Sequence, residues 1–325
     1  MLKTICFLID ASGTEGVRRG MLLESSQKVC LIYNPVAGAG KSKKIFPQVT
    51  ELLKEKHIDF DVVTTQGPGD AERLARELPR DEYRALVSMG GDGTLHEVVN
   101  GLLTSEKGLL PVTAIPVGTG NDFVTGNCIF THWTETVEAL EKHVPKKIDV
   151  MHVRDGGNWT RWAINSIGVG IDAYVAIRVS ELQTKKVGKL SYAIEFVRGL
   201  FSFEPFNMHL VTDGTHADVE EVWLCASMNS EHLGGGLIIC PGASAYDGVL
   251  NFGHLSHASR PYLVRVLLRV FKGAHVGMPG VYISTAHTLS IHPSRDVPVH
   301  LDGEIKDVKF PITIEIFPEA LEFIG

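Results

Sequence analysis

The chain has 325 residues, of which 44 % are apolar and 21 % are charged, a composition that excludes a disordered or collagen-like protein. At roughly 150 residues per domain, this length predicts about two domains. The formal net charge of −7 excludes a global positive field, so we expect no nucleic-acid partner.

The first 27 residues include a short apolar segment and then residues 10–20, which are rich in glycine, serine and charge. The first clear strand pattern begins at Lys28, after a second methionine at Met21. We therefore expect residues 1–27 to be an N-terminal extension outside the fold, or the product of a start codon assigned too early.

Between residues 28 and 146, apolar runs of strand length alternate with segments whose apolar residues recur at helical spacing. Strands are predicted at 28–33, 60–64, 85–88 and 113–115, and helices at 42–56, 70–78, 94–103 and 134–142. Four strands that are each followed by a helix predict an α/β domain, in which helices cover both faces of a parallel sheet.

Over residues 147–317 the pattern changes to short alternating segments separated by turn residues. Strands are predicted at 147–153, 161–167, 208–212, 221–228, 249–255, 288–292, 297–301 and 313–317. Two helical segments, 173–199 and 260–272, interrupt them. This pattern predicts a second domain with an antiparallel β-sandwich fold.

Three glycine-rich turns follow predicted strands of the first domain, at the sheet edge where open α/β sheets bind ligands. They are residues 34–41 (NPVAGAGK), 90–94 (GGDGT) and 116–123 (PVGTGNDF). The first turn matches a P-loop only in part, because Pro35 stands where that motif requires a glycine. Taken alone, this turn is also consistent with a strand-to-helix connection that binds no ligand.

The second turn allows close approach of a phosphate to backbone N–H groups at the start of a helix. Asp92 within it would repel that phosphate unless a divalent cation lay between them, so the turn favours a magnesium–nucleotide complex. An Asp-Gly turn with Asp92 as a helix cap is the alternative. The third turn repeats the pattern with Asp122, and two such turns together favour ligand binding.

Five motifs together resemble the diacylglycerol kinase catalytic-domain family, which includes bacterial diacylglycerol and lipid kinases and is related to sphingosine and ceramide kinases. In chain order they are NPxxG (34–38), GGDGT (90–94), PxGTxNDF (116–123), a DG-L turn (245–250) and DGE (302–304). The resemblance extends from about residue 29 to the end. It implies that residues of about 318–325 return to the first domain, which otherwise spans 28–146.

The resemblance implies that ATP and Mg²⁺ lie in a cleft between the domains. The nucleotide-binding residues it implies are Asn34, Pro35, Gly38, Thr65, Gly90, Gly91, Asp92, Gly93, Thr94, Leu95, His96, Gly118, Thr119, Asn121 and Asp122. Asp92 and Asp122 would hold the catalytic Mg²⁺. Asp247, with the backbone carbonyls of Ser244 and Val249, would hold a second, structural Mg²⁺.

The catalytic base implied by the resemblance lies in the DGE motif. Asp302 is the first choice and Glu304 the second, while the GGDGT motif shared with sphingosine kinases makes Asp92 a third candidate. A metal ligand is a poor base because the cation lowers its pKa, which argues against Asp92.

The expected activity is transfer of the γ-phosphoryl group of ATP to the hydroxyl of a lipid alcohol, with diacylglycerol or a related glycerolipid as the first choice. A kinase of NAD type, which shares GGDGT, is one alternative. A non-catalytic nucleotide-binding regulatory protein is another, although such a protein would be expected to have lost one of the motif carboxylates.

Location and partners are predicted from composition and local patterning. Five cysteines without a CxxC pair favour a reducing, cytoplasmic environment, and no apolar run reaches the ~20 residues of a spanning helix. Basic and apolar residues alternate in the segments 185–203 and 260–272, which predicts peripheral contact with an anionic membrane surface. Equally, these segments could pack on their own domain. A homodimer formed through an exposed strand edge is left open.

Overall fold

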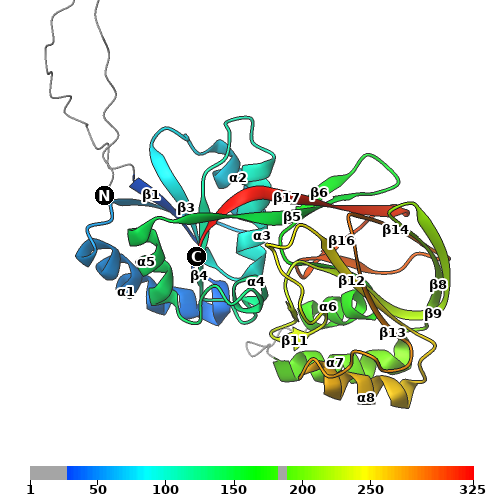
Figure 1. Cartoon of the computed structure of the whole chain (residues 1–325). Coiled ribbons are helices and arrows are strands. Elements are labelled where there is room, and N and C mark those ends of the chain that lie inside the picture. Colours follow the sequence, from blue (N-terminus) through cyan, green and yellow to red (C-terminus); the bar gives the residue numbers. More distant parts are fainter. Residues whose placement is uncertain (1–27, 182–188) are drawn as a thin grey trace, which may run out of the picture.

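The computed structural model describes residues 28–181 and 189–325. The expected N-terminal extension, residues 1–27, lies outside the described residues. The described chain forms two domains that lie side by side, one α/β and one mainly β, as the sequence predicts (Figure 1).

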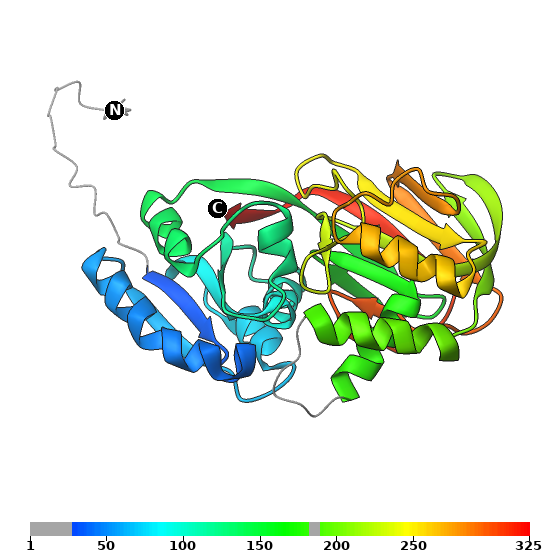
Figure 2. The ribbon, with the colours of Figure 1, turned by 90° about the horizontal axis from the view of Figure 1, so that it is seen from below.

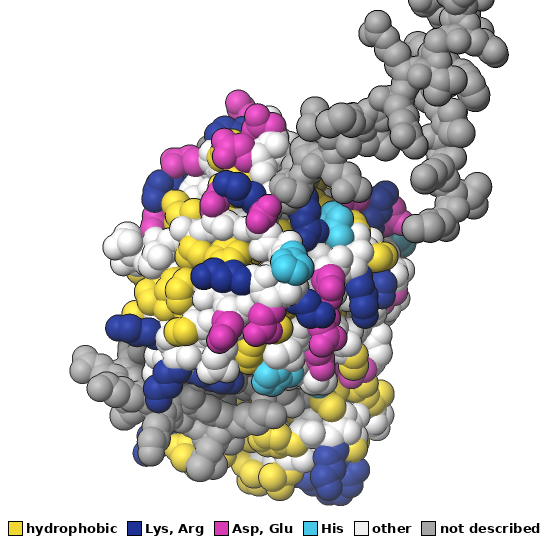
Figure 3. Space-filling view, turned by 90° about the vertical axis from the view of Figure 1, so that its left-hand side faces the viewer, with side chains coloured by type: hydrophobic (Ala, Val, Ile, Leu, Met, Phe, Trp, Pro, Cys, Tyr) yellow, Lys and Arg dark blue, Asp and Glu magenta, His cyan; other side chains and the backbone are white. Residues whose placement is uncertain are grey.

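The first domain has a parallel sheet with the strand order β2-β1-β3-β4. Its strands are β1 (Lys28–Tyr33), β2 (Phe60–Thr64), β3 (Tyr83–Gly90) and β4 (Val112–Pro116). Its helices are α1 (Lys41–Glu55), α2 (Asp70–Glu77), α3 (Asp92–Leu103), α4 (Asp122–Gly126) and α5 (Trp133–Lys142), with a 3₁₀ turn over Ala37–Gly40. Figure 3 views the end of this domain and shows basic and acidic side chains interspersed.

Alternate side chains of β1 enter two separate cores. Leu31 packs in one core with Val49 of α1 and Leu140 of α5. Ile32 packs in the other with Val98 of α3, on the opposite face of the sheet. The apolar run of β1 is therefore buried on both faces, which is why it shows no alternation with polar residues.

The second domain packs antiparallel strands and helices around a main core, with a smaller buried cluster beside it. Its strands are β6 (Thr160–Ala163), β7 (Ser166–Gly170), β8 (Phe206–Thr212), β9 (Thr215–Met228), β12 (Leu250–Ser256), β13 (Val281–Ala286), β14 (Thr288–Pro293), β15 (Val299–Leu301) and β16 (Glu304–Lys306), with a small hairpin of β10 (His232–Leu233) and β11 (Leu237–Ile238). Its helices are α6 (Ile171–Glu181), α7 (Lys189–Ser202) and α8 (Arg260–Val270), and they lie together along one side of the domain (Figure 2).

Two long strands run through both domains. β5 (Pro145–Arg154) and β17 (Ile312–Ile324) pair antiparallel, with an irregularity between Phe317 and Leu321. Near its end, β17 pairs parallel to β4 through Phe323 and Val112, while its beginning pairs with β14. The two domains therefore share a continuous sheet (Figure 1).

The strands β10, β11, β13 and β16 were not predicted from the sequence, and two predicted elements of the second domain are each divided in the structure. The predicted helix 173–199 is divided between α6 and α7, and residues 182–188 lie outside the described part. The predicted strand 161–167 is two strands, β6 and β7, interrupted at Ile164 and Asn165. The backbone N–H groups of these two residues donate to the Asp302 carboxylate instead of to a neighbouring strand.

Candidate active site

A cleft with a volume of about 740 Å³ lies where the two domains meet. The first domain lines it with all three glycine-rich turns and with the segment after β2. The second domain contributes the β10 end and the turn between β15 and β16. Among the lining residues are Asn34, Pro35, Gly38, Thr65, Gly91, Asp92, Gly93, Thr94, Gly118, Thr119, Asp122, Leu233, Gly234, Asp302 and Glu304.

Glycine is required where these turns meet because their backbones touch. A Cβ on Gly38, whose φ is +60°, would lie 2.1 Å from the carbonyl oxygen of Val117. A Cβ on Gly118 would lie 2.5 Å from the Cα of Gly91. The side-chain amide of Asn34 then joins the first turn to the second by donating to Thr94 Oγ1 at 2.9 Å. These contacts leave open backbone along the cleft, where a phosphate can approach.

Asp92 and Asp122 bring two carboxylates to one point of this cleft. A Cβ on Gly120 would lie 2.7 Å from Asp92 Oδ2 and 3.3 Å from Asp122 Oδ2. Asp92 accepts from the N–H of Asn121 at 2.6 Å, and Asp122 accepts from the N–H of Gly235 at 3.0 Å. Asn121 contributes by shaping the third turn, since its Oδ1 accepts from the Gly118 N–H.

Burial and mutual repulsion oppose ionisation of this pair. Burial, and then the charge of Asp122, raises the pKa of Asp92 from 3.8 to about 7. Burial also raises the pKa of Asp122. Such a pair suits a divalent cation, which would neutralise both charges, and Mg²⁺ is commonly held by one or two carboxylates together with substrate phosphates. Groups of three or more metal-ligating side chains are absent from the described residues, so nucleotide oxygens would have to complete this site.

The side chain of Asp302, the first-choice base from the sequence, is buried and fully hydrogen-bonded. Its side chain is only 1 % exposed. Oδ1 accepts from the N–H groups of Asn165 and Ser166, and Oδ2 accepts from the N–H of Ile164 and from His96 Nδ1 at 2.7 Å. Burial alone would raise the pKa of Asp302, but these bonds, led by that from His96, lower it below 3.8. A carboxylate whose oxygens are all hydrogen-bonded is a poor proton acceptor, which argues against Asp302 as the base.

The side chain of Glu304 has a different environment from that of Asp302, although the two residues are only two positions apart. Its side chain is exposed to the cleft, and a Cβ on Gly93 would lie 2.9 Å from Glu304 Oε1. The DGE turn therefore places one carboxylate in the protein interior and the other over the GGDGT turn, beside Asp92.

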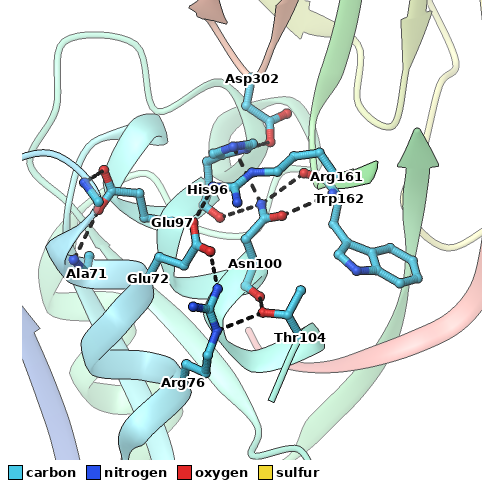
Figure 4. A network of polar contacts seen from close by, with 11 residues as sticks. Ala71, Glu72, Arg76, His96, Glu97, Asn100, Thr104, Arg161, Trp162 and Asp302 are labelled. Atoms are coloured by element: carbon cyan, nitrogen blue, oxygen red, sulfur yellow. Dashed lines mark hydrogen bonds and ion pairs between the residues drawn. The ribbon is translucent and has the colours of Figure 1, made fainter. Parts of the chain in front are cut away.

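His96 and Leu95 are buried in the structure and do not line the cleft, contrary to their expected nucleotide role. His96 instead reaches Asp302 in the other domain, as Figure 4 shows. Gly90 is also outside the cleft lining, and its carbonyl accepts from the N–H groups of Val117 and Gly118.

The contact of His96 belongs to a polar network between the domains (Figure 4). The Asn100 side chain donates to the Trp162 carbonyl at 2.9 Å and accepts from the Trp162 N–H at 3.0 Å. Glu72 of α2 forms an ion pair with Arg161 of β6. These contacts hold β6 and the DGE turn against α3.

Glu97 and the glycines 234–236 were not assigned a role from sequence. Glu97 accepts from the N–H groups of Gly69 and Ala71, so it caps α2 at the wall of the cleft. The Gly235 N–H donates to Asp122, which brings the β10–β11 hairpin to the Asp92–Asp122 pair. The run of three glycines in the sequence could have indicated a close approach of the backbone to another segment. Nothing in the sequence around Glu97 indicates that it caps a helix that begins 27 residues earlier.

The expected second Mg²⁺ site at Asp247 remains a prediction. In the structure the Asp247 carboxylate accepts from the N–H of Val249 and from the Asn251 side chain, both at 3.1 Å. The link between the domains at this point comes from buried Asp149, which accepts from the N–H groups of Gly248 and Glu319.

Comparison with known proteins assigns the chain to a family. Residues 28–153 match the "Diacylglycerol kinase catalytic domain", and residues 165–325 match the "YegS C-terminal NAD kinase beta sandwich-like domain". The chain therefore belongs to the family of diacylglycerol kinases and related lipid kinases, as its motifs indicate.

Relatives of known name agree with this assignment. The chain is 27 % identical over 309 residues to a diacylglycerol kinase of Mycobacterium tuberculosis, covering 91 % of this chain and 94 % of that protein. It is 26 % identical over 275 residues to a diacylglycerol kinase of Bacillus subtilis, covering 84 % and 88 %. Its fold resembles the crystal structure of a diacylglycerol kinase from Bacillus anthracis, with a TM-score of 0.68, 21 % identity, and coverage of 92 % and 96 %.

Proposed function

We propose that the protein is an ATP-dependent lipid kinase that phosphorylates the hydroxyl group of a lipid alcohol, with diacylglycerol or a related glycerolipid as the acceptor class. One observation carries this proposal: a polar cleft with converging carboxylates opens directly beside an apolar cavity. Leu233, Gly234 and Gly303 line both spaces. A nucleotide at the glycine-rich turns and a lipid in the apolar cavity would then meet at the DGE turn.

The first domain supplies the nucleotide site in this proposal. Backbone groups of residues 34–38, 91–94 and 118–120 would contact the phosphates of ATP, and Thr65 at the end of β2 lies at the same cleft. Asp92 and Asp122 would hold Mg²⁺, which supplies positive charge to the transferring phosphoryl group when it is bound.

Glu304 would act as the base. The lipid hydroxyl oxygen forms a bond to the γ-phosphorus of ATP, the bond from that phosphorus to the β–γ bridging oxygen breaks, and the hydroxyl proton passes to the Glu304 carboxylate. The products are ADP and a lipid phosphate. Glu304 suits this role because its carboxylate faces the cleft beside Gly93, whereas the oxygens of Asp302 are fully hydrogen-bonded.

The second domain would hold the hydrocarbon part of the acceptor. The apolar cavity lies between the sheet and helices α6, α7 and α8, and its volume is about 80 Å³. Its walls are largely aliphatic and aromatic, and include Val175, Phe196, Leu263, Val266, Leu267 and Val270. An apolar wall favours a lipid over the polar dinucleotide that a kinase of NAD type would require.

Contact with a membrane surface would occur at α7 and α8, which enclose this cavity. Each helix presents apolar side chains outward: Phe201 is 76 % exposed and Leu268 is 65 % exposed. Arg198 on α7 and Arg269 on α8 stand among them with exposed side chains. Exposed apolar side chains flanked by arginines suit the surface of an anionic bilayer. Within the residues that the structure describes, no helix is long and apolar enough to cross a membrane.

The direct test is incubation of the protein with radiolabelled ATP, Mg²⁺ and lipid alcohols dispersed in detergent, followed by extraction of lipids into an organic phase. We expect label in the lipid fraction with wild type and at least 100-fold less with Glu304→Gln. Labelled NAD phosphate without labelled lipid would contradict the proposal, as would bound ATP with no transfer to any acceptor.

A further inference from the structure

The two-residue turn between β15 and β16 carries the proposed base. Leu301 pairs with Glu304 across this hairpin, so Asp302 and Gly303 form the whole turn. Both residues have positive φ, +50° at Asp302 and +84° at Gly303, as a type I′ turn requires. A turn this short has little conformational freedom. The contacts that hold its two residues therefore set the direction in which the Glu304 side chain leaves the hairpin.

His300 holds the Gly303 side of this turn. Its Nδ1 accepts from the N–H of Gly303 at 3.3 Å. Because a backbone N–H can only donate, Nδ1 is unprotonated and the ring proton is on Nε2. The Asp302 carboxylate is held separately, by three backbone N–H groups and His96. His300 therefore acts on the residue that directly precedes Glu304.

Asp172 holds the His300 ring in this protonation state. His300 Nε2 donates to Asp172 Oδ2 at 3.1 Å, and the two side chains are only 3 % and 12 % exposed. Asp172 lies in the first turn of α6, where the helix dipole favours a negative charge. A carboxylate beside Nε2 keeps the proton on that nitrogen, which leaves Nδ1 able to accept. The pair thus fixes both the tautomer and the orientation of the ring.

The backbone beside the pair is shaped to admit it. His300 is opposite Gly168 in the ladder between β15 and β7. A Cβ on Gly168 would lie 1.8 Å from Asp172 Oδ2 and 2.3 Å from His300 Nε2. A larger residue at this position would displace one of the two side chains. Glycine at position 168 is therefore a condition for the bond between His300 and Asp172.

We infer that His300 is a positioning residue, which orients Glu304 toward the reacting hydroxyl through its hydrogen bond with the Gly303 N–H. This inference rests on the proposed function, in which Glu304 is the base. His300 lines the apolar cavity, Glu304 lines the cleft, and Gly303 lines both. His300 thus acts from behind the turn. Displacement of a catalytic group by about 1 Å can cost on the order of 10²-fold in rate.

Two substitutions that replace different nitrogens of the ring separate its two hydrogen bonds. In His300→Asn the amide oxygen takes the place of Nδ1 and accepts from Gly303, but the donor to Asp172 is lost. In His300→Gln the amide NH₂ takes the place of Nε2 and donates to Asp172, but the acceptor for Gly303 is lost. We expect kcat for lipid phosphorylation to fall at least about 10-fold in His300→Gln and less than about 3-fold in His300→Asn.

Stability should follow the opposite order. Asp172 Oδ1 is buried without a hydrogen-bond partner, so loss of the His300 donor in His300→Asn leaves this carboxylate unpaired. In a denaturant titration His300→Asn should therefore be the less stable variant, although it is the more active one per folded molecule. A histidine with a purely structural role would give the same order in both measurements, which would overturn the inference.

The separation of kcat from binding is the second readout. In His300→Gln, KM for the lipid and Kd for Mg–ATP should stay within about 3-fold of wild type, because a displaced base affects mainly the transition state. His287→Gln, whose side chain is 71 % exposed, is the matched control and should retain wild-type kcat and stability. A rise in the KM for the lipid with unchanged kcat would overturn the inference.

Combination with Glu304→Gln tests whether His300 acts through the base. In that background His300→Gln should lower the remaining kcat by less than about 2-fold, because the position of a side chain that no longer accepts a proton has little effect. An equal loss in both backgrounds would show that His300 acts by another route.

The outcomes separate the inference from the proposed function. Wild-type kcat in His300→Gln overturns the role of His300 and leaves the lipid kinase proposal standing. If His300→Gln does not fold, nitrogen NMR of wild type with isotope-labelled histidine decides, with the His300 signals identified by their absence in His300→Asn. A proton on Nε2 supports the inference, and a proton on Nδ1 overturns it. Binding of Mg–ATP without phosphorylation of any lipid alcohol contradicts the proposed function itself.

Discussion

The glycine-rich turns of the first domain and the DGE turn of the second domain both bring carboxylates to the cleft. The carboxylates differ in their environment and in the direction of their pKa shifts. Asp122 is buried and Asp92 is half-buried, both accept backbone N–H groups, and desolvation still raises their pKa values. Asp302 is buried with four donors, and its pKa is lowered. The Asp92–Asp122 pair could therefore still bind a cation, whereas the oxygens of Asp302 already accept hydrogen bonds from the protein. Proximity of a carboxylate to the cleft therefore does not by itself define a catalytic role.

The largest effect that this comparison predicts is on turnover in Glu304→Gln. The amide is similar in size but cannot accept the hydroxyl proton, so turnover should fall by about 10²–10⁴-fold. The melting temperature and the affinity for Mg–ATP should stay near wild type because Glu304 is exposed. Steady-state lipid phosphorylation and calorimetric ATP binding measure the two parts. Retention of more than a tenth of wild-type turnover would place the base elsewhere.

We expect Asp302→Asn to lower the stability of the folded protein. The amide NH₂ would face the N–H groups or the His96 ring that now donate to the carboxylate, so we expect a loss of roughly 2–4 kcal/mol in the free energy of unfolding. Denaturant titration measures this loss. A variant as stable as wild type but inactive would instead support Asp302 as the base.

Asp92→Asn should change the pH dependence of stability. The pKa of Asp92 rises from 3.8 to about 7 on folding, so its stabilising contribution is full below pH 3.8 and is lost as the pH rises through 7. At pH 8 without Mg²⁺, the variant should therefore be more stable than wild type by on the order of 1–3 kcal/mol.

The matching control for Asp92→Asn is Mg²⁺. Addition of Mg²⁺ should raise the melting temperature of wild type more than that of the variant, because binding to the folded state stabilises it. Melting curves between pH 5 and pH 8, with EDTA or with Mg²⁺, measure both effects. A variant less stable than wild type by the same amount at every pH would contradict the assigned state of Asp92.

The smallest effect is expected for Asp247→Ala. This side chain accepts one exposed hydrogen bond from Val249 and one partly buried hydrogen bond from Asn251, so its loss should cost about 0.5–1.5 kcal/mol, equally with and without Mg²⁺. A loss seen only in the presence of Mg²⁺ would restore the second metal site. Asp149→Ala is the comparison variant and should cost more, because Asp149 is buried and joins Gly248 to Glu319.

Much of the fold was predictable because the spacing of apolar residues along the sequence indicates which side chains are buried. The strands and helices of the first domain follow from apolar spacing, and the three glycine-rich turns lie at one sheet edge as parallel topology requires. The interruption between β6 and β7 was not predictable, since it depends on N–H groups of Ile164 and Asn165 that bind Asp302 more than 130 residues away.

The site was predictable as a set of residues but not as a set of roles. The DGE motif indicates two carboxylates, and only the structure separates them, because Asp302 turns inward to His96 while Glu304 faces the cleft. The Asp172–His300 pair has no motif, since α6 and β15 bring its members together from 128 positions apart.

The most direct test of this account is one parallel assay of wild type, Glu304→Gln and Asp302→Asn, with radiolabelled ATP, Mg²⁺ and dispersed lipid alcohols, with the unfolding free energy of each protein measured beside it. The account predicts labelled lipid from wild type, a stable protein that does not label lipid for Glu304→Gln, and a destabilised protein for Asp302→Asn whose folded fraction retains activity. Full activity in Glu304→Gln, together with a stable and inactive Asp302→Asn, would contradict it.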